Sequence, residues 1–415
     1  MADFLSYINA QGLVDGVALS DLAAQFGTPL YVYSAEAIRA RYRSYHAHGL
    51  HDEVVVHYAV KANSNLAILR LLAAEGAGFD IVSVGELERV LCAGGMPEST
   101  VFSGVAKTDA ELQRALDVGI GCFNVESPEE LQRLAALAAA SGKVAPFALR
   151  VNPNVDAQTH PYISTGMRQN KFGVTMEVAP QLYRWAATQP SLRIMGIGCH
   201  IGSQILTLAP FLEAADSIFS LADTLLSEGI TIEHIDMGGG LAVATAETPK
   251  APEPAALVQA LLQKLAGRPY QLHLQPGRSL VGNAGILLTQ VVFVKEQAER
   301  QFLMLDAAMN DYIRPALYQV RPTMLNLNRP YDGHSMMDVV GPVCESGDTF
   351  AREYPIVGQR GDLIAFTGVG AYGFAMSSHY NTRPRAAEVL IDNGTARLIR
   401  RRETLTELWA QEMDI

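Results

Sequence analysis

A lysine, a histidine, a triple glycine and an arginine in this chain stand where they could share one piece of chemistry. Lys61 follows an apolar run, and His200 ends another and is followed by Gly-Ser. Gly238–Gly240 and the arginine of the Pro-Gly-Arg278 segment come after later apolar runs. A lysine amine in an apolar mouth loses solvation, which lowers its pKa and lets it form a Schiff base. An imidazole can stack on a flat ring, while glycine N–H groups and a guanidinium can hold an anion.

Each of these residues also has an ordinary structural interpretation. Lys61 could extend to solvent, His200 could be a core histidine with satisfied hydrogen bonds, and three glycines can form a tight turn. Together they describe a ligand with an aldehyde, a flat ring and a phosphate, which is pyridoxal 5'-phosphate (PLP). We expect Lys61 to hold the aldehyde, His200 to cover the ring, and the glycines with Arg278 and Ser203 to hold the phosphate. No metal site is expected.

Three later segments carry groups suited to an amino-acid substrate. Arg314 and Tyr318 are four residues apart, which would place them on one face of a helix that grips a carboxylate. Cys344 stands beside Glu345 in a turn-rich loop, and Tyr372 lies in a glycine-flanked segment. A free cysteine is more often a small buried hydrophobe than a reactive group, and that interpretation of Cys344 stays open.

The elements that must position these residues alternate along the chain. Short β-branched or apolar runs are separated by Ala-, Leu- and Glu-rich stretches with helical spacing. Eight strands are predicted, over Val54–Tyr58, Gly78–Val82, Thr100–Ser103, Gly119–Asn124, Phe147–Val151, Ile194–His200, Thr231–Met237 and Tyr270–Leu274. Helices are predicted between them, over Asn65–Ala74, Val84–Cys92, Asp109–Leu116, Pro128–Ala140 and Phe211–Ser227.

Eight strands alternating with helices predict an α/β fold, a closed (β/α)₈ TIM-type barrel. A doubly wound open sheet would give the same local alternation, and the number of strands favours closure. Active-site residues of such barrels come from the C-terminal ends of the strands, where the residues above stand. Ala244–Ala256, rich in proline and acidic residues, is predicted as a long loop after the seventh strand.

A second, mostly antiparallel β domain is predicted after the barrel. The predicted strands are Pro29–Ser34, Ile286–Val294, Phe302–Asp306, Met337–Val340, Asp362–Phe366, Ala386–Ile391 and Ala396–Arg400. Asn393-Gly394 between the last two is a good hairpin turn. We therefore expect residues 35–285 to form the PLP-binding barrel, and residues 1–34 with 286–415 to form a β-sandwich or β-barrel-like domain.

The motifs of this chain resemble those of diaminopimelate decarboxylases, which belong to the alanine-racemase-like (fold type III) family of PLP-dependent enzymes. The resemblance runs from about residue 28 to the end and follows the family order. It rests on the segments YAVKAN, FDIVS, CHIGSQ, DMGGG, PGRS, RPALY, GPVCESGD, AYGF and NTRPR. It implies decarboxylation of meso-2,6-diaminopimelate to L-lysine, the last step of lysine biosynthesis. It also implies a head-to-tail homodimer with shared active sites.

The resemblance further implies roles for individual residues. Lys61 would form the Schiff base, with Asp80 near it and His200 stacked on the ring. The phosphate would be held by residues of three loops, namely Ser203, Gly239, Gly240, Gly277 and Arg278. The substrate would be bound by Arg278, Arg314, Tyr318 and Tyr372 (the last also touching the cofactor), with Glu345 on its distal ammonium. Glu345 and Cys344 would come from the partner subunit, and Cys344 would donate a proton.

One residue departs from the family pattern. The carboxylate that precedes Pro-Gly-Arg and pairs with the pyridine nitrogen is Gln275 here. A neutral amide cannot act as a counter-ion, so the ring should be a weaker electron sink. Either turnover is reduced, in which case Gln275→Glu should raise kcat, or another acid compensates.

Three other functions remain open. A related decarboxylase acting on ornithine, arginine or carboxynorspermidine needs no site for a second amino-acid head, so Arg314, Tyr318 and Glu345 argue against it. A non-catalytic PLP carrier would lack the β domain. Because of Gln275, however, a weakly active PLP-binding homologue is still an alternative. A Schiff-base aldolase on a plain barrel would show no PLP absorbance.

Composition limits the partners. The chain has 415 residues, 49% of them hydrophobic and 18% charged, so it is long enough for two domains and too apolar to be disordered. Its net charge of −11 disfavours nucleic acids and anionic membranes. Arg400–Arg402 is interpreted as a solvated face. The chain has no apolar stretch long enough to span a membrane, and Asp3 stands where a signal peptide would have basic residues. Its four cysteines are scattered and indicate no disulfide framework, so we expect a cytoplasmic protein.

Overall fold

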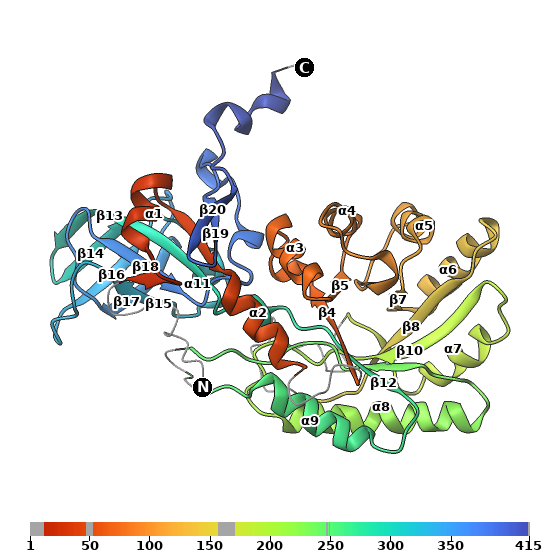
Figure 1. The fold of residues 1–415 in the computed structure, drawn as a ribbon. Coiled ribbons are helices and arrows are strands. Elements are labelled where there is room, and N and C mark those ends of the chain that lie inside the picture. Colours follow the sequence, from red (N-terminus) through yellow and green to blue (C-terminus); the bar gives the residue numbers. More distant parts are fainter. Residues whose placement is uncertain (1–11, 47–52, 157–170, 246–247, 249, 414–415) are drawn as a thin grey trace. The chain divides into compact units, whose positions relative to one another are not determined.

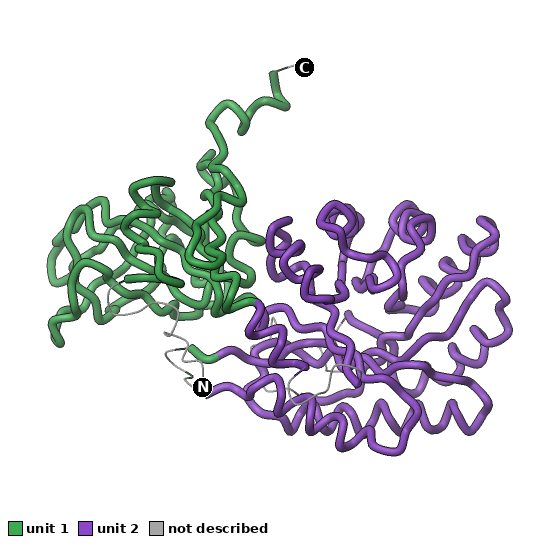
Figure 2. Tube along the Cα trace, viewed as in Figure 1, with its two compact units in different colours: residues 1–38, 244–249, 281–415 green, residues 39–243, 250–280 purple. Residues whose placement is uncertain are grey.

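The computed structural model describes residues 12–46, 53–156, 171–245, 248 and 250–413, so Asp3 and part of the predicted loop after the seventh strand lie outside it. The chain divides into two compact units, coloured separately in Figure 2. One contains Arg39–Val243 and Lys250–Leu280, and the other contains Met1–Ile38, Ala244–Pro249 and Val281–Ile415. The domain boundaries expected from the sequence, at residues 34/35 and 285/286, stay a prediction.

The purple unit of Figure 2, which we name the barrel unit, is a closed barrel of eight parallel strands (Figure 1). The strands are β4 (Val54–Ala59), β5 (Gly78–Ile81), β6 (Thr100–Phe102), β7 (Cys122–Val125), β8 (Ala145–Asn152), β10 (Leu192–Gly198), β11 (His234–Asp236) and β12 (Gln271–Leu274). Each pairs in parallel with the next, and the pairing of β12 with β4 closes the ring. A short strand β9 (Val174–Thr175) adds to β8 outside the ring. The predicted (β/α)₈ barrel is confirmed.

Helices follow the strands, and the first four after β4, α3 to α6, begin at polar caps. They are α3 (Leu66–Ala74), α4 (Val84–Cys92), α5 (Asp109–Val118), α6 (Pro128–Ala140), α7 (Ala179–Ala186), α8 (Ala209–Ser227) and α9 (Pro254–Leu265), preceded by α2 (Ala35–Ser44). The side chains of Ser83, Thr108 and Ser127 each accept a backbone N–H in the first turn of the next helix. The predicted loop through Ala256 is too long, because α9 already begins at Pro254, a residue well suited to the first turn.

Three histidines from neighbouring barrel strands form a cluster that the sequence analysis did not anticipate. The rings of His234 and His273 stack with centroids 4.0 Å apart, and His57 Nε2 lies 3.2 Å from His273 Nδ1. His57 Nδ1 lies 3.2 Å from the carbonyl oxygen of Ser99, which can only accept, so this nitrogen carries the proton. Two of the rings need glycine neighbours: a Cβ at Gly196 would lie 2.4 Å from His234 Nε2, and one at Gly78 would lie 2.5 Å from His57 Nδ1.

The green unit of Figure 2, which we name the β unit, is mostly antiparallel β structure. Its main strands are β3 (Leu30–Ser34), β13 (Gly285–Gln297), β14 (Arg300–Leu305), β15 (Thr323–Asn326), β16 (Met336–Val340), β17 (Thr349–Pro355), β18 (Leu363–Thr367), β19 (Ala387–Asp392) and β20 (Thr395–Arg400). The long strand β13 pairs with β3 and β18 over its first half and with β14 over its second. Only β14 with β16 and β3 with β19 are parallel among the described pairings of this unit. The predicted antiparallel β fold is confirmed.

The N-terminal strand and the last hairpin of this unit agree with the sequence analysis. Strand β3 lies between β13 and β19. Between β19 and β20, Asn393 and Gly394 have φ of 49° and 71°, the left-handed values that a tight hairpin turn requires. Beneath these strands lies a core that includes Leu30, Val32 and Val389.

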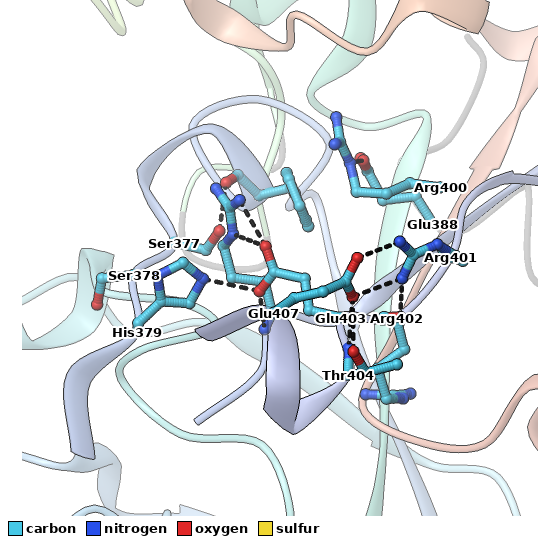
Figure 3. Close-up of polar contacts among 12 residues, drawn as sticks. Ser377, Ser378, His379, Glu388, Arg400, Arg401, Arg402, Glu403, Thr404 and Glu407 are labelled. Carbon is cyan, nitrogen blue, oxygen red and sulfur yellow. Dashed lines mark hydrogen bonds and ion pairs between the residues drawn. The ribbon is translucent and has the colours of Figure 1, made fainter. Parts of the chain in front are cut away.

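In the arginine run Arg400–Arg402, the first two residues pair with glutamates and the third bonds to the backbone (Figure 3). Arg400 Nε pairs with Glu388 Oε2 at 2.5 Å, and Arg401 pairs with Glu407. Arg402 Nη2 donates to the backbone oxygen of Pro29 at 2.6 Å. The run is therefore a set of paired side chains and not the freely solvated face that we expected.

Helices of the described residues are all too short or too polar to cross a lipid bilayer.

Candidate active site

Every strand of the barrel contributes a polar residue at or just beyond its C-terminal end. In strand order these are Lys61, Asp80, Ser103, Asn124, Arg150, His200, Asp236 and Gln275. All of them except Asp80 line one pocket, and Asp80 is bonded to Lys61. The closed ring explains this convergence, because parallel strands bring all their carboxyl ends to one face.

Lys61 is held at the mouth by a buried carboxylate. It lies in a short 3₁₀ turn, Val60–Ala62, directly after β4, and its Nζ is 2.8 Å from Asp80 Oδ2. Asp80 is fully buried, and its Oδ1 accepts from Ser103 Oγ at 2.5 Å. The lysine side chain is 37% exposed and ion-paired. This differs from the desolvated lysine expected from the sequence, because Asp80 at the end of the neighbouring strand supplies a counter-charge.

His200 is neutral in this setting. Burial lowers the pKa of its imidazole well below the usual range, and the positive charges of Arg150 and Lys61 lower it further. The Gly239 N–H donates to His200 Nδ1 at 3.2 Å, so the proton of the neutral ring is on Nε2. A neutral, oriented imidazole beside Lys61 is suited to stacking on a flat ring.

The glycine loop and the arginine loop lie against each other. A Cβ at Gly239 would stand 2.2 Å from the Gln275 carbonyl oxygen, so no larger residue fits there without moving the loop. Gly240 has a φ of 112°, a conformation that favours glycine. Gly277 is close-packed as well, since its Cβ would lie 3.0 Å from that of Ala62.

Arg278 and Ser203 come from separate loops of the same unit and meet. The Nη2 and Nε atoms of Arg278 lie 3.3 and 3.4 Å from Ser203 Oγ. A guanidinium and a hydroxyl beside close-packed glycine backbone make a donor set suited to a phosphate.

Arg150 has an unused donor at the pocket. Its Nη1 pairs with Glu126 Oε1 at 2.8 Å, whereas its Nη2 is buried without a hydrogen-bond partner among the described residues. A buried guanidinium N–H left unpaired is costly, and an acceptor on a ligand would satisfy it. This orphan atom, and the donor set of Ser203 and Arg278, are suited to an anionic, acceptor-rich group such as PLP.

Gln275 is paired with a carboxylate. Its Nε2 donates to Asp236 Oδ2 at 2.7 Å, while the other oxygen of Asp236 accepts from the Gly238 N–H at 2.8 Å. The sequence analysis assigned no role to Asp236, Ser103, Asn124 or Arg150. Their position at strand ends was the available signal, and it did not distinguish them from residues that merely end a strand.

In the β unit, two predicted substrate residues, Tyr318 and Tyr372, lie beside the guanidinium of a third, Arg314. Arg314 and Tyr318 bound the helix α11 (Arg314–Tyr318), as their spacing predicted. The buried guanidinium of Arg314 lies 4.8 Å from the centre of the Tyr318 ring and 5.9 Å from that of Tyr372. These aromatic faces stabilise the cation and orient it.

Cys344 and Glu345 form a separate group in that unit. Cys344 is exposed, so the interpretation as a small buried hydrophobe is wrong; a tight turn keeps it at the surface. Its backbone N–H donates to Asn381 Oδ1 at 2.8 Å. The Tyr380 hydroxyl donates to Glu345, and this bond raises the pKa of Tyr380. The loop that carries both residues is thus fixed by the segment just before Arg383.

Comparison with known proteins agrees with this geometry. The family described as "Pyridoxal-dependent decarboxylase, pyridoxal binding domain" matches residues 35–282. A diaminopimelate decarboxylase from Vibrio cholerae is 51% identical over 414 residues, which cover 99% of both chains. One from Pseudomonas aeruginosa is 51% identical over 411 residues, again 99% of both. The chain belongs to the diaminopimelate decarboxylase family.

Solved structures of the family share the fold. The diaminopimelate decarboxylase from Helicobacter pylori, complexed with L-lysine, matches with a TM-score of 0.91 at 40% identity, covering 95% of this chain and 98% of that one. The family and the PLP-barrel fold expected from the sequence are therefore confirmed. The relatives match the whole chain, so both the barrel and the β unit belong to the family architecture.

Proposed function

We propose that this chain decarboxylates meso-2,6-diaminopimelate to L-lysine and CO₂ with PLP as its cofactor. The observation that carries the proposal is the ring of polar strand ends around Lys61, in a chain of this family. Bound PLP supplies an electron sink for the electron pair that remains when the carboxylate leaves. The residues of the protein have to hold that group, orient the substrate and deliver a proton.

The barrel residues have binding and orienting roles in this proposal. Lys61 is the amine that attaches the cofactor, and Asp80 fixes its Nζ. His200 packs its neutral imidazole against the ring. The remaining predicted contacts hold the phosphate, from Ser203, Gly239, Gly240, Gly277 and Arg278. Residues 35–285 form the cofactor-binding domain, with 1–34 and 286–415 as the second domain.

The residues of the β unit determine the substrate specificity. Arg314 and Tyr318 hold a substrate carboxylate together with Arg278, and Tyr372 contacts both cofactor and substrate. Glu345 of the partner subunit binds the distal ammonium. Cys344 of the partner subunit donates the proton that replaces the lost carboxylate. The homodimer with shared active sites and the cytoplasmic location are parts of the same proposal.

The test is substrate-dependent CO₂ release. PLP-loaded protein is incubated separately with meso-2,6-diaminopimelate, L-ornithine and L-arginine, and both CO₂ and the amine products are measured. We expect CO₂ and L-lysine from the first substrate alone. Release only from ornithine and arginine would assign the chain to the diamine-forming decarboxylases instead. No release from any substrate, with PLP bound, would support the weakly active homologue suggested by Gln275.

A further inference from the structure

Gln275 stands where the family pattern has a carboxylate, and the structure places a different carboxylate directly behind it. Asp236 is 2% exposed, and its Oδ2 accepts from Gln275 Nε2 at 2.7 Å. Both residues line the pocket that contains Lys61 and His200. The acid missing at position 275 is therefore replaced, one strand away, by an acid in contact with the amide.

Asp236 is a buried carboxylate without a cationic partner. No ion pair in the described ranges includes it, and its hydrogen bonds come from the neutral groups Gly238 N–H and Gln275 Nε2. Its pKa is raised to about 7, mainly by burial and also by the negative charge of Asp80, while the Gly238 N–H, Arg150 and Lys61 act in the opposite direction. A positive charge delivered to the pocket by a ligand would stabilise the ionised form of Asp236.

The negative charge of Asp236 can polarise the amide of Gln275. An ionised carboxylate only accepts hydrogen bonds, so Nε2 faces Asp236 and Oε1 is left as an acceptor. The carboxylate polarises the amide and makes Oε1 a stronger acceptor. Two other carboxylates at these strand ends are already engaged. Asp80 uses Oδ2 for Lys61 and Oδ1 for Ser103, and Glu126 uses Oε1 for Arg150 and Oε2 for the Gly173 N–H. Gln275 is thus the acceptor best placed for a protonated ring nitrogen.

We propose that Asp236, acting through the amide of Gln275, is the negative charge that keeps the ring nitrogen of bound PLP protonated. The inference rests on the proposed function, because it needs PLP in this pocket. Asp236 is a positioning residue here, since Gln275 stands between it and the cofactor. The proposal chooses the second of the two sequence alternatives, in which another acid compensates for the missing glutamate.

A charge swap isolates this role from a merely structural one. Asp236→Asn removes the charge but keeps an oxygen for the Gly238 N–H, and its amide can still bond to a flipped Gln275. The double variant Asp236→Asn with Gln275→Glu restores one carboxylate and one amide with the hydrogen bond reversed. Asp311→Asn is the matched control. Asp311 belongs to the β unit and is also almost fully buried, and burial raises its pKa to about 6.

The readout is the ¹⁵N chemical shift of PLP labelled at the ring nitrogen, bound to each holoenzyme, with PLP affinity measured alongside. Wild type and the Asp311→Asn control should show a protonated nitrogen. Asp236→Asn should shift it to the unprotonated form and weaken PLP binding about tenfold, the factor equal to one pKa unit. The double variant should return both quantities to near wild type.

A protonated nitrogen and unchanged affinity in folded Asp236→Asn would overturn the inference, and the proposed function would still stand. If that variant does not fold, Gln275→Met decides, because it removes the amide between Asp236 and the ring: an unprotonated nitrogen supports the role of Asp236 through Gln275, and a protonated one refutes it. If wild type binds no PLP, the proposed function fails before the inference is reached. If wild type binds PLP with an unprotonated nitrogen, the inference alone fails.

Discussion

Side chains at the barrel mouth hold one another through short polar contacts. Ser103 donates to Asp80 at 2.5 Å and accepts from Asn124 Nδ2 at 3.1 Å, so the carboxylate that holds Lys61 is itself held from two further strands. Side chains restrained in this way lose little freedom when a ligand binds, and the site is prepared for it.

Cys344→Ala tests the proposed proton donor. The substitution leaves the backbone N–H of residue 344 free to keep its bond to Asn381. Because a positioned general acid contributes about 10²–10⁴-fold, kcat for L-lysine formation should fall by a factor in that range while KM changes little. Cys92→Ala, at another exposed free cysteine, should keep the wild-type kcat. A kcat equal to wild type in Cys344→Ala would remove this residue from the mechanism.

Arg314→Ala tests substrate recognition. A hydrogen bond to a charged group is worth about 1.5–3 kcal/mol, so KM for meso-2,6-diaminopimelate should rise roughly 10–100-fold. Arg314→Lys keeps the charge but loses the planar fork, and should give an intermediate KM. Steady-state kinetics with purified holoenzyme measure both. The same KM in all three proteins would show that this guanidinium does not bind the substrate.

The sequence revealed these residues to different extents. Lys61 and His200 could be found because each follows or ends an apolar strand with no structural need for a polar group there. Asp236 could not, because its contact with Gln275 is made across two strands that are far apart in the chain. The unpaired Nη2 of Arg150 is likewise a property of packing and has no counterpart in sequence spacing.

The residues at the ends of several helices determine where those helices begin. Helices α4 and α6 have the predicted bounds because Ser83 and Ser127 cap them. Strands β15 and β17 were not predicted: β15 has four residues, and β17 carries exposed Arg352 and Glu353 that hide its alternation. The local sequence therefore predicted the elements of the barrel better than the strands of the β unit, because the pairing of those strands depends on partners that are distant in the chain.

Thr108→Ala tests the cap of α5. Thr108 and Glu111 form a reciprocal capping box, in which each side chain accepts the other's backbone N–H. Loss of such a cap costs about 1 kcal/mol, so the unfolding free energy from urea denaturation should decrease by that amount. Thr108→Ser keeps the hydroxyl and should keep the stability. Equal stability of Thr108→Ala and wild type would mean that this cap contributes nothing.

At the scale of the whole molecule, the histidine cluster makes stability depend on pH. Burial lowers the pKa values of His57, His234 and His273, that of His234 to about 3, and the neighbouring imidazoles lower those of His234 and His273 further. Above about pH 6.5 these residues are neutral in both states. Below it, the unfolded chain binds protons that the folded barrel excludes, so stability falls as pH decreases.

His234→Phe should weaken that dependence. Phenylalanine keeps a ring beside His273 but cannot titrate, so urea-derived unfolding free energies between pH 6.5 and pH 4.5 should fall less steeply, by up to about 1.4 kcal/mol per pH unit. An unaltered slope in His234→Phe would show that this residue takes no part in the acid sensitivity.

The account as a whole depends on a single covalent attachment in the barrel. PLP-loaded protein is reduced with borohydride, digested, and the pyridoxyl label is located by mass spectrometry. We predict one labelled residue, Lys61, and no label in a Lys61→Ala variant treated in the same way. Label on another lysine, or an unlabelled chain, would contradict the proposed active site.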